Sequence, residues 1–256
     1  MSALSAIVVL LSPVSPDGWH LAVSRVPAGL VVTAAFAVAA RILRSVSLSG
    51  AIAGAAVTFL LWIAWPPLFM VELAVFVLTA AATRAGYRRK QQLGTAEKRE
   101  GRSASQVLAN LAVATACALL ATYLHKPLLM FACAGALAEA AADTISSEMG
   151  QALGAEPVLL TTLRPVPVGT DGGVSGPGTL AGMAAALVVS GVAVLTASVP
   201  GYGLAIAAMA AVCGMFFDSL LGATLERRRI LNNDQVNFSS TLLAAGLAIA
   251  IAKLWQ

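Results

Sequence analysis

Acidic residues occur inside two apolar stretches of the chain. Asp143 and Glu148 belong to the segment Ala142-Asp-Thr-Ile-Ser-Ser-Glu-Met-Gly150, which ends a long apolar run, and Asp218 lies in a later run. Because a carboxylate is costly to bury in hydrocarbon, acids in such positions indicate a functional site. Oxygen ligands without a cluster of His or Cys favour Mg²⁺ over zinc, and Mg²⁺ is commonly bound together with phosphates. We therefore expect a catalytic Mg²⁺ site with Asp143, Glu148 and Asp218 as its ligands.

The helical spacing of these acids does not decide whether they bind the same ion. Glu139 and Asp143 are four residues apart and share a helical face, whereas Glu148 follows Asp143 by five residues, roughly 140° around an ideal helix. Asp143 and Glu148 can bind one ion only if the helix ends or loosens near Gly150; otherwise their roles are separate. In the alternative interpretation, the acids pair with arginines of the loops and only hold helix ends together.

A glycine-rich segment, Gly169-Thr-Asp-Gly-Gly-Val-Ser-Gly-Pro-Gly-Thr179, precedes the next apolar run. Glycines allow the backbone to approach a ligand closely, and the N-terminus of the following helix would direct positive partial charge toward an anion. The segment predicts nucleotide or phosphate binding by Gly169, Thr170, Gly172, Gly173 and Ser175. The alternative is a flexible loop that ends in a Ser or Thr helix cap. The phosphate-binding motifs G-x-x-x-x-G-K-[ST] and G-x-G-x-x-G after a strand are absent from the sequence.

The composition is that of an integral membrane protein. Hydrophobic residues make up 59% of the chain, charged residues only 11%, and the mean hydropathy is +0.85. A soluble domain carries about twice that share of charged residues. Apolar runs of helix-spanning length recur throughout, so we expect an all-α, polytopic membrane helix bundle.

About eight spans are expected, after a short N-terminal apolar segment. Residues 2–11 are apolar but the run is short, so residues 1–25 are set apart from a single transmembrane domain over residues 26–256. The run at 47–65 is polar at its start, which indicates a kinked or half-buried helix. The eight expected spans are 26–44, 47–65, 67–87, 104–125, 127–150, 178–199, 201–226 and 238–254.

Basic residues favour one side of this arrangement. Alternating the spans places thirteen of the 16 Lys and Arg residues on the side that holds the connection near 45 and the loops 88–103, 151–177 and 227–237. The positive-inside rule assigns that side to the cytoplasm, and the clustering gives no reason to expect nucleic acid as a partner. Asn110, Asp143, Asp218 and Asn237 fall at the same face. We therefore predict one active site at the cytoplasmic face of the cell membrane, with Arg102 at its rim as a possible phosphate ligand.

Together these motifs resemble the integral membrane family that contains the phytyl-phosphate kinase of vitamin E synthesis. The resemblance runs from about Ser24 to the C-terminus. One departure is Asn232, where an Asp is expected, and another is Ser175-Gly-Pro-Gly-Thr179, which replaces a more apolar stretch. The matching segments are Gln106-Val-Leu-Ala-Asn110, Ala142–Gly150, Pro167-Val-Gly-Thr-Asp-Gly-Gly-Val-Ser175, Asp218-Ser-Leu-Leu-Gly-Ala-Thr224 and Asn233-Asp-Gln-Val-Asn-Phe-Ser-Ser240.

The resemblance implies a kinase that phosphorylates an isoprenoid monophosphate to its diphosphate, with Mg²⁺ and with CTP or another nucleoside triphosphate as donor. The order of motifs is also similar to that of CTP-dependent dolichol kinases and phosphatidate cytidylyltransferases. In this interpretation Arg102 or Arg164 would bind negative charge, and Asp171 would ligate metal or orient the nucleotide. Asn110, Asn233 and Asn237 would hydrogen-bond phosphate or sugar, and the isoprenoid tail would lie between spans.

Other classes of protein remain open. A cytidylyltransferase that acts on a lipid phosphate would use the same residues, and only the bond cleaved in the nucleotide would differ. A transporter would also bury acids in helices, but usually near the midplane of discontinuous helices rather than toward one face. A scaffold without catalytic activity would tolerate removal of the acids. The oligomeric state, the length of the lipid chain and the choice of nucleotide are left open by the sequence.

Overall fold

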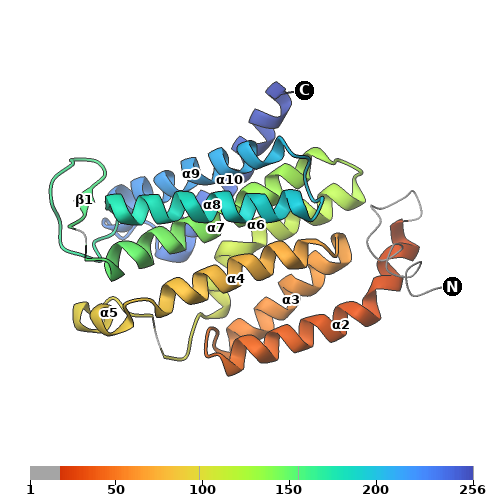
Figure 1. Ribbon diagram of the computed structural model, residues 1–256, viewed down its shortest axis with the longest axis horizontal. Helices are drawn as coiled ribbons and strands as arrows, with labels where there is room; N and C mark the ends of the chain where they lie inside the picture. Colours follow the sequence, from red (N-terminus) through yellow and green to blue (C-terminus); the bar gives the residue numbers. More distant parts are fainter. Residues whose placement is uncertain (1–17, 98, 155, 256) are drawn as a thin grey trace.

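The computed structural model describes residues 18–97, 99–154 and 156–255, and they form a bundle of helices with one very short hairpin (Figure 1). The expected all-α polytopic membrane bundle is confirmed. The helices are α2 (Gly18–Ile42), α3 (Leu48–Ala64), α4 (Leu68–Arg84), α5 (Tyr87–Leu93), α6 (Ala104–Tyr123), α7 (Leu128–Ala152), α8 (Gly176–Leu195), α9 (Gly203–Leu221), the π-helical turn η1 (Gly222–Glu226) and α10 (Asn233–Trp255). Strands β1 (Val158–Leu159) and β2 (Gly173–Val174) pair antiparallel.

Each of the eight expected spans corresponds to a helix in the structure, but some of these helices are too short to cross a bilayer on their own. Six described helices, α2, α6, α7, α8, α9 with η1, and α10, are long and apolar enough. Helices α4 and α5, bent by 63° at a short break, would make a seventh span if taken together. With 17 residues, α3 is about 26 Å long, short of the roughly 30 Å of a hydrocarbon core. Its cap at Ser47 and the pair Pro66-Pro67 fix its ends.

The first described helix is longer than the sequence indicates. We expect the first span to begin at Val26, whereas α2 already begins at Gly18 and continues through Pro27. The apolar segment at residues 2–11 lies outside the described residues.

Helix α7 is the centre of the bundle and packs against α4, α6, α8, α9 and α10. Much of its buried surface is alanine, and small residues allow helices to approach closely in a membrane. Helix α8 lies against it at two glycines. A Cβ on Gly178 would lie 2.5 Å from the Ser146 carbonyl oxygen, and one on Gly182 would lie 2.7 Å from that of Ala142. The acid-bearing part of α7 is therefore held tightly between neighbours.

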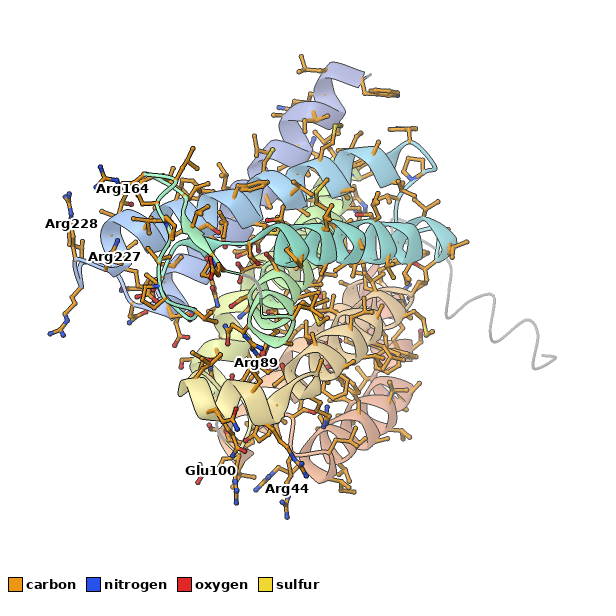
Figure 2. The ribbon with its side chains drawn as sticks, turned by 60° about the vertical axis from the view of Figure 1, so that its left-hand side comes forward. Arg44, Arg89, Glu100, Arg164, Arg227 and Arg228 are labelled. Carbon is orange, nitrogen blue, oxygen red and sulfur yellow. The ribbon has the colours of Figure 1, made fainter. Side chains whose placement is uncertain are left out.

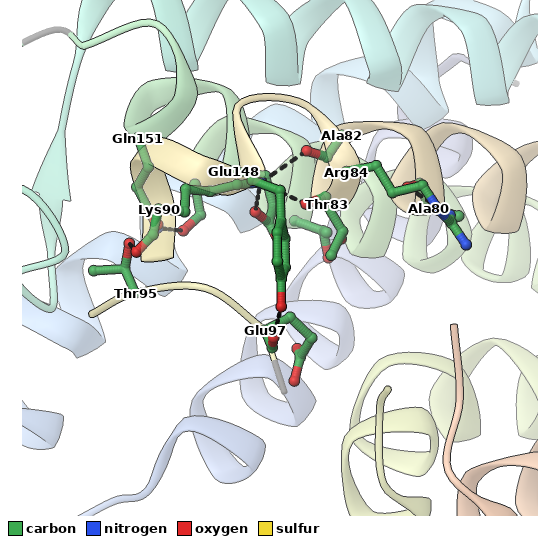
Figure 3. A network of polar contacts seen from close by, with 12 residues as sticks. Ala80, Ala82, Thr83, Arg84, Lys90, Thr95, Glu97, Glu148 and Gln151 are labelled. Atoms are coloured by element: carbon green, nitrogen blue, oxygen red, sulfur yellow. Dashed lines mark hydrogen bonds and ion pairs between the residues drawn. The ribbon is translucent and has the colours of Figure 1, made fainter. Parts of the chain in front are cut away.

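Two fully buried cations cap helix ends inside the bundle. Arg25 of α2 donates to the carbonyl oxygens of Ile63 and Ala64 at 2.8 and 2.9 Å, where α3 ends. Lys90 of α5 donates to the carbonyl oxygens of Ala82 and Thr83 at 3.0 and 2.7 Å, near the end of α4 (Figure 3). The last carbonyl groups of a helix lack partners within the helix, so each cation satisfies groups that burial would otherwise leave unpaired.

The loops that are rich in arginine lie together at one end of the bundle, as the threading of the spans predicts. Figure 1 shows α5 and β1 at this end and the C-terminus at the other. Figure 2 turns it toward the viewer and shows Arg44, Arg89, Arg164, Arg227 and Arg228 spread over it. We call this the basic end of the bundle. It comprises the described residues of the segments 43–47, 85–97, 99–103, 153–154, 156–175 and 222–232.

Candidate active site

Three carboxylates from two helices meet between α7, α9 and α10, and we call Glu139, Asp143 and Asp218 the acidic cluster. Asp143 lies within hydrogen-bonding reach of Asp218, and the charges of Asp143 and Glu139 both act on Asp218. The single hydroxyl proton of Ser240 on α10 has two acceptors within reach, the Asn237 carbonyl at 2.9 Å and Oδ2 of Asp218 at 3.3 Å, and Ser240 is also a side-chain partner of Glu139. The expected meeting of Asp143 and Asp218 is therefore present in the structure.

The members of the acidic cluster differ in how far a ligand could reach them. Glu139 is 1% exposed, and its Oε1 has no hydrogen-bond partner. It fits only because residue 214 is glycine, since a Cβ there would lie 2.5 Å from Cγ of Glu139. Asp143 and Asp218 are only half-buried. The cluster thus has a closed inner side at Glu139 and an accessible side formed by the two aspartates.

Arg102 is the basic residue whose charge acts on Asp143. Its Nη2 lies 3.5 Å from Oγ1 of Thr144 on α7. Within the described residues, none of the three carboxylates forms an ion pair. Because carboxylates so close together repel one another, the cluster favours binding of a further positive charge.

The backbone of Arg102 is paired with the connection between α2 and α3. The Arg102 amide donates to the Ser45 carbonyl at 3.0 Å, and the Ser47 amide donates to the Arg102 carbonyl at 2.9 Å. Gly101 permits this pairing because its φ is +81° and a Cβ would lie 2.5 Å from the Ser45 carbonyl carbon. Ser103 and Gln106 then form a capping box that begins α6. The backbone from which the Arg102 side chain extends is therefore fixed on both sides.

Glu148 does not join the acidic cluster. Helix α7 continues past Gly150 to Ala152, so the condition for Glu148 and Asp143 to share one ion is not met. Glu148 instead forms an ion pair with the buried Lys90 of α5, shown in Figure 3. The described residues contain no group of three or more His, Cys, Asp or Glu side chains arranged to hold a metal ion. The expected three-acid ligand set of Asp143, Glu148 and Asp218 is thus not assembled.

The glycine-rich loop lies against η1, which directly follows the helix of Asp218. At Gly172, φ is +74° and a Cβ would overlap the Ala223 backbone; at Gly169, φ is +85° and a Cβ would overlap the Thr95 side chain. These two glycines are needed for close packing. The loop therefore approaches the acidic cluster through its contact with η1.

Several groups expected to bind phosphate are used within this loop. The Thr170 amide and hydroxyl both donate to the Pro167 carbonyl, at 3.2 and 2.7 Å. The Gly173 amide donates to the Thr170 carbonyl at 2.9 Å, and Ser175 Oγ caps α8 by accepting from the Gly178 amide at 3.3 Å. These contacts match the alternative of a loop that ends in a serine cap.

The loop also carries an acid toward η1. Asp171 is exposed, and its charge acts on Glu226 at the end of η1, as does the charge of Asp143. Glu226 was not predicted as a site residue. Its spacing from Asp218, eight residues or about two helical turns, is the signal that could have placed it on the same face.

The asparagines and Arg164, which were expected to bind phosphate or sugar, lie at different distances from the acidic cluster. Asn110 is 7% exposed and donates to the Gln106 carbonyl at 2.8 Å. Asn233 and Asn237 lie one turn apart on α10, with Nδ2 of the first 3.3 Å from Oδ1 of the second. Asn237 is one turn before Ser240, next to the acidic cluster, whereas Arg164 is exposed on its loop and points away from the bundle in Figure 2.

Asn232 has a structural role at the start of α10. Its Oδ1 accepts from the Gln235 amide at 2.9 Å, and its own amide donates to Oε1 of Gln235 at 3.0 Å. Asn is as good an N-cap as Asp, so this departure from the motif leaves the helix start intact.

A cavity of about 510 Å³ lies on the other side of Arg102, between α2, α3, α4 and α6. Most of its wall is apolar, from residues such as Phe36, Val75 and Phe76, and Arg102 and Asn110 line it as well. At or beside the basic end the cavity is also lined by one acid, Glu97, and by three arginines, Arg44, Arg84 and Arg99. The sequence assigned Arg44 and Arg84 only to orientation in the membrane, whereas Arg99 was also a candidate for binding phosphate. The cavity therefore has an apolar body and a basic mouth, which suits an amphiphile with an anionic head.

The chain is similar to known families and proteins over most of its length. The family model described as "Integral membrane protein DUF92" matches residues 31–245. The uncharacterized membrane protein sll0875 of Synechocystis sp. is 37% identical over 72% of this chain and 73% of its own length. The uncharacterized membrane protein MJ0933 of Methanocaldococcus jannaschii is 32% identical over 70% of this chain and 74% of its own length.

A plant protein is also among the relatives. Protein VTE6, chloroplastic, of Arabidopsis thaliana is 32% identical over 71% of this chain. The match covers 57% of the plant protein, so this chain spans little more than half of that relative. No solved structure matches the chain.

Proposed function

The chain belongs to the DUF92 family of integral membrane proteins, and from this premise we propose that it is a prenyl-phosphate kinase. It would transfer the γ-phosphoryl group of CTP or another nucleoside triphosphate to an isoprenoid monophosphate. The observation that carries the proposal is the position of Arg102. Arg102 lines the cavity that suits an amphiphile, and its charge also acts on Asp143 of the acidic cluster.

The acceptor would bind with its hydrocarbon chain in the cavity and its phosphate at the basic mouth. Apolar burial supplies the affinity for the chain, and guanidinium groups bind phosphate through charge-assisted hydrogen bonds. Arg84 is held in place by donating to the Leu43 carbonyl at 2.6 Å and to Ser45 Oγ at 3.1 Å, so it would contribute charge more than direct contacts. Arg102 would hold the acceptor phosphate next to the acidic cluster.

The donor would bind on the side of the acidic cluster. Mg²⁺ is usually held by one or two carboxylates together with substrate phosphates, so Asp143 and Asp218, adjacent and half-buried, fit this cation without a third acid. Its charge would neutralise the phosphates of the donor. Asn237 and the glycine-rich loop, with Asp171, form the nearby surface for the nucleotide, whereas Glu148 and Arg164 have no place in this proposal.

The reaction needs little from the protein beyond position and charge. An oxygen of the acceptor phosphate is already anionic; it forms a bond to the γ-phosphorus as the bond from this phosphorus to the bridging β–γ oxygen breaks, and the nucleoside diphosphate leaves with that oxygen. Phosphoryl transfer of this kind depends mainly on alignment and on stabilisation of spread negative charge. Arg102 would hold the attacking oxygen in line and offset part of the charge.

Independent features support this assignment. The motifs that resemble phytyl-phosphate kinases supply Asn110, Asp143 and Asp218, which lie near the border between cavity and cluster. The arginine-rich loops share one end of the bundle, which by the positive-inside rule would face the cytoplasm from the cell membrane. Partners of other kinds, nucleic acid among them, are not part of the proposal.

The test is to supply purified protein with Mg²⁺, geranylgeranyl phosphate and CTP labelled on either the α- or the γ-phosphorus. We expect the γ label in the lipid and CDP as the other product. The α label in the lipid, with release of pyrophosphate, would instead identify a cytidylyltransferase. Movement of prenyl phosphate across vesicles without any transfer of label would identify a transporter.

Arg102→Gln sharpens this test. Loss of a charge-assisted hydrogen bond to phosphate costs roughly 1.5–3 kcal/mol, so we expect the KM for the prenyl phosphate to rise about 10- to 100-fold. The matched control is Arg164→Gln, an exposed arginine of the same end of the bundle, which should leave KM within about twofold. Equal effects of the two substitutions would remove Arg102 from the acceptor site.

A further inference from the structure

The inner end of the cavity contains a buried acid that the proposed reaction does not use. Glu72 of α4 is 3% exposed and lines the cavity. Thr58 of α3 donates to its Oε1 at 2.8 Å, but its Oε2 has no hydrogen-bond partner. If this acid only joined α3 to α4, both oxygens would be expected to have donors, because an unpaired buried polar atom is costly. One unpaired oxygen at a cavity wall indicates that the cavity ends in a polar surface.

The distance from the mouth to this surface is fixed by a single helix. Arg84 and Glu72 both line the cavity from α4 and are twelve residues apart, about 18 Å along the axis at the ordinary helical rise. The lining residues between them on α4 are Val75, Phe76, Thr79, Ala80 and Thr83, which are mostly apolar. The cavity is therefore a mostly apolar passage of set length, with several arginines and one acid, Glu97, at one end and Glu72 at the other.

We propose that Glu72 limits the length of the hydrocarbon chain that the cavity accepts. This inference rests on the proposed function, in that an acceptor lipid occupies the cavity. A chain that ends before Glu72 leaves water in the cavity beside the Glu72 side chain, whose Oε2 is itself buried. A chain one isoprene unit longer must replace that water with hydrocarbon against a buried carboxyl group that has only one hydrogen bond, so its binding is penalised.

Two substitutions should move this limit in opposite directions. Glu72→Leu keeps a similar size and removes the polar surface, so longer chains should bind. Gly54→Leu fills the cavity from α3, because Gly54 lines it and a Cβ there would meet nothing within 4 Å. Gly54 is one helical turn from Thr58 toward the mouth, so this substitution should exclude chains that the unchanged protein binds. Glu72→Gln is the matched control, since it keeps both size and polarity.

The experiment measures equilibrium binding of a series of prenyl phosphonates to the full chain in detergent, without nucleotide. The series runs from geranyl through farnesyl and geranylgeranyl to geranylfarnesyl. We expect affinity to increase with chain length up to a limit and then to fall. Glu72→Leu should raise affinity for the first chain beyond the limit at least tenfold, about 1.4 kcal/mol, and leave shorter chains unchanged. Gly54→Leu should lower the limit, and Glu72→Gln should keep it.

A steady increase of affinity over the whole series, or a limit that a folded Glu72→Leu variant does not move, would overturn the inference. If Glu72→Leu does not fold, Glu72→Met, which also removes the carboxyl group, takes its place, and Gly54→Leu shows separately that the chain occupies the cavity. A chain-length limit without any phosphoryl transfer would support the inference and refute the kinase. Phosphoryl transfer without a chain-length limit would support the kinase and refute the inference. Failure of the unchanged protein to bind any phosphonate would refute both the kinase and the inference.

Discussion

Two carboxylates of α7 that are only five residues apart have opposite surroundings. Glu148 is paired with Lys90, whose side chain is fully buried and also caps α4 (Figure 3). Asp143 instead lies beside Asp218 and Glu139, with Arg102 as the cation that acts on it. The bundle thus supplies a dedicated counter-ion where an acid holds helices together. It leaves negative charge in excess where, in our proposal, substrate and cation bring the compensation.

Lys90→Met should have the largest effect, and on stability. It leaves Glu148 partly buried without its counter-ion and the end of α4 without its cap, which together are expected to cost about 3–5 kcal/mol. The measurement is reversible unfolding in mixed detergent micelles.

The double variant Lys90→Met/Glu148→Met should recover most of this stability, because no uncompensated charge is then buried. Lys126→Met, at an exposed lysine, is the control and should be nearly neutral. If Lys90→Met and Lys126→Met unfolded alike, the pair would not be the structural element described.

Asp143→Asn and Asp218→Asn should reduce phosphoryl transfer by roughly 10²–10³-fold, the usual effect of removing a group that stabilises charge in the transition state. Stability should be unchanged or slightly higher, because each substitution removes repulsion within the acidic cluster. Single-turnover transfer and unfolding in micelles, measured on the same samples, separate the two effects. Glu100→Gln, an exposed acid of the basic end, serves as control. Transfer at the level of this control in both aspartate variants would rule out the acidic cluster as the catalytic centre.

Ser240→Ala should have the smallest effect. It removes a hydrogen bond to Asp218 that shares its proton with the Asn237 carbonyl, worth up to about 1 kcal/mol, so we expect transfer to fall by up to roughly fivefold. The neighbouring Ser239→Ala is the matched control, since Ser239 donates only to the Gln235 carbonyl on its own helix. A larger loss in Ser239→Ala than in Ser240→Ala would contradict the proposed support of Asp218.

The sequence predicted the helices and part of the candidate site, and both predictions depend on hydropathy. Apolar runs and prolines locate spans, and counting spans places Arg102, Asn110, Asp143 and Asp218 at one end of the bundle. The structure brings these residues to the border between cavity and cluster. The finer assignment of acids was not predictable, because Lys90 lies in a basic segment that hydropathy marks only as a loop. Its partner depends on the 63° bend between α4 and α5.

The glycine-rich loop shows a second limit of sequence reasoning. Its composition allows either open amides or close packing, and only the contact of Gly172 with Ala223 distinguishes them. Glu226 and Ser240 were missed because their importance depends on which helices are neighbours of α9. Arg164 is a suitable residue type for binding phosphate, but it lies on an exposed part of the loop and points away from the acidic cluster.

The backbone pairing between Arg102 and the connection of α2 and α3 has a mechanical consequence. Helices α2 and α3 form two walls of the cavity, and their connection is hydrogen-bonded on both sides to residue 102. A tilt of these walls would therefore move the backbone that carries Arg102, the cation that acts on Asp143. In the proposed function, a lipid that spreads or draws in the walls would also shift the charge that binds its own head group.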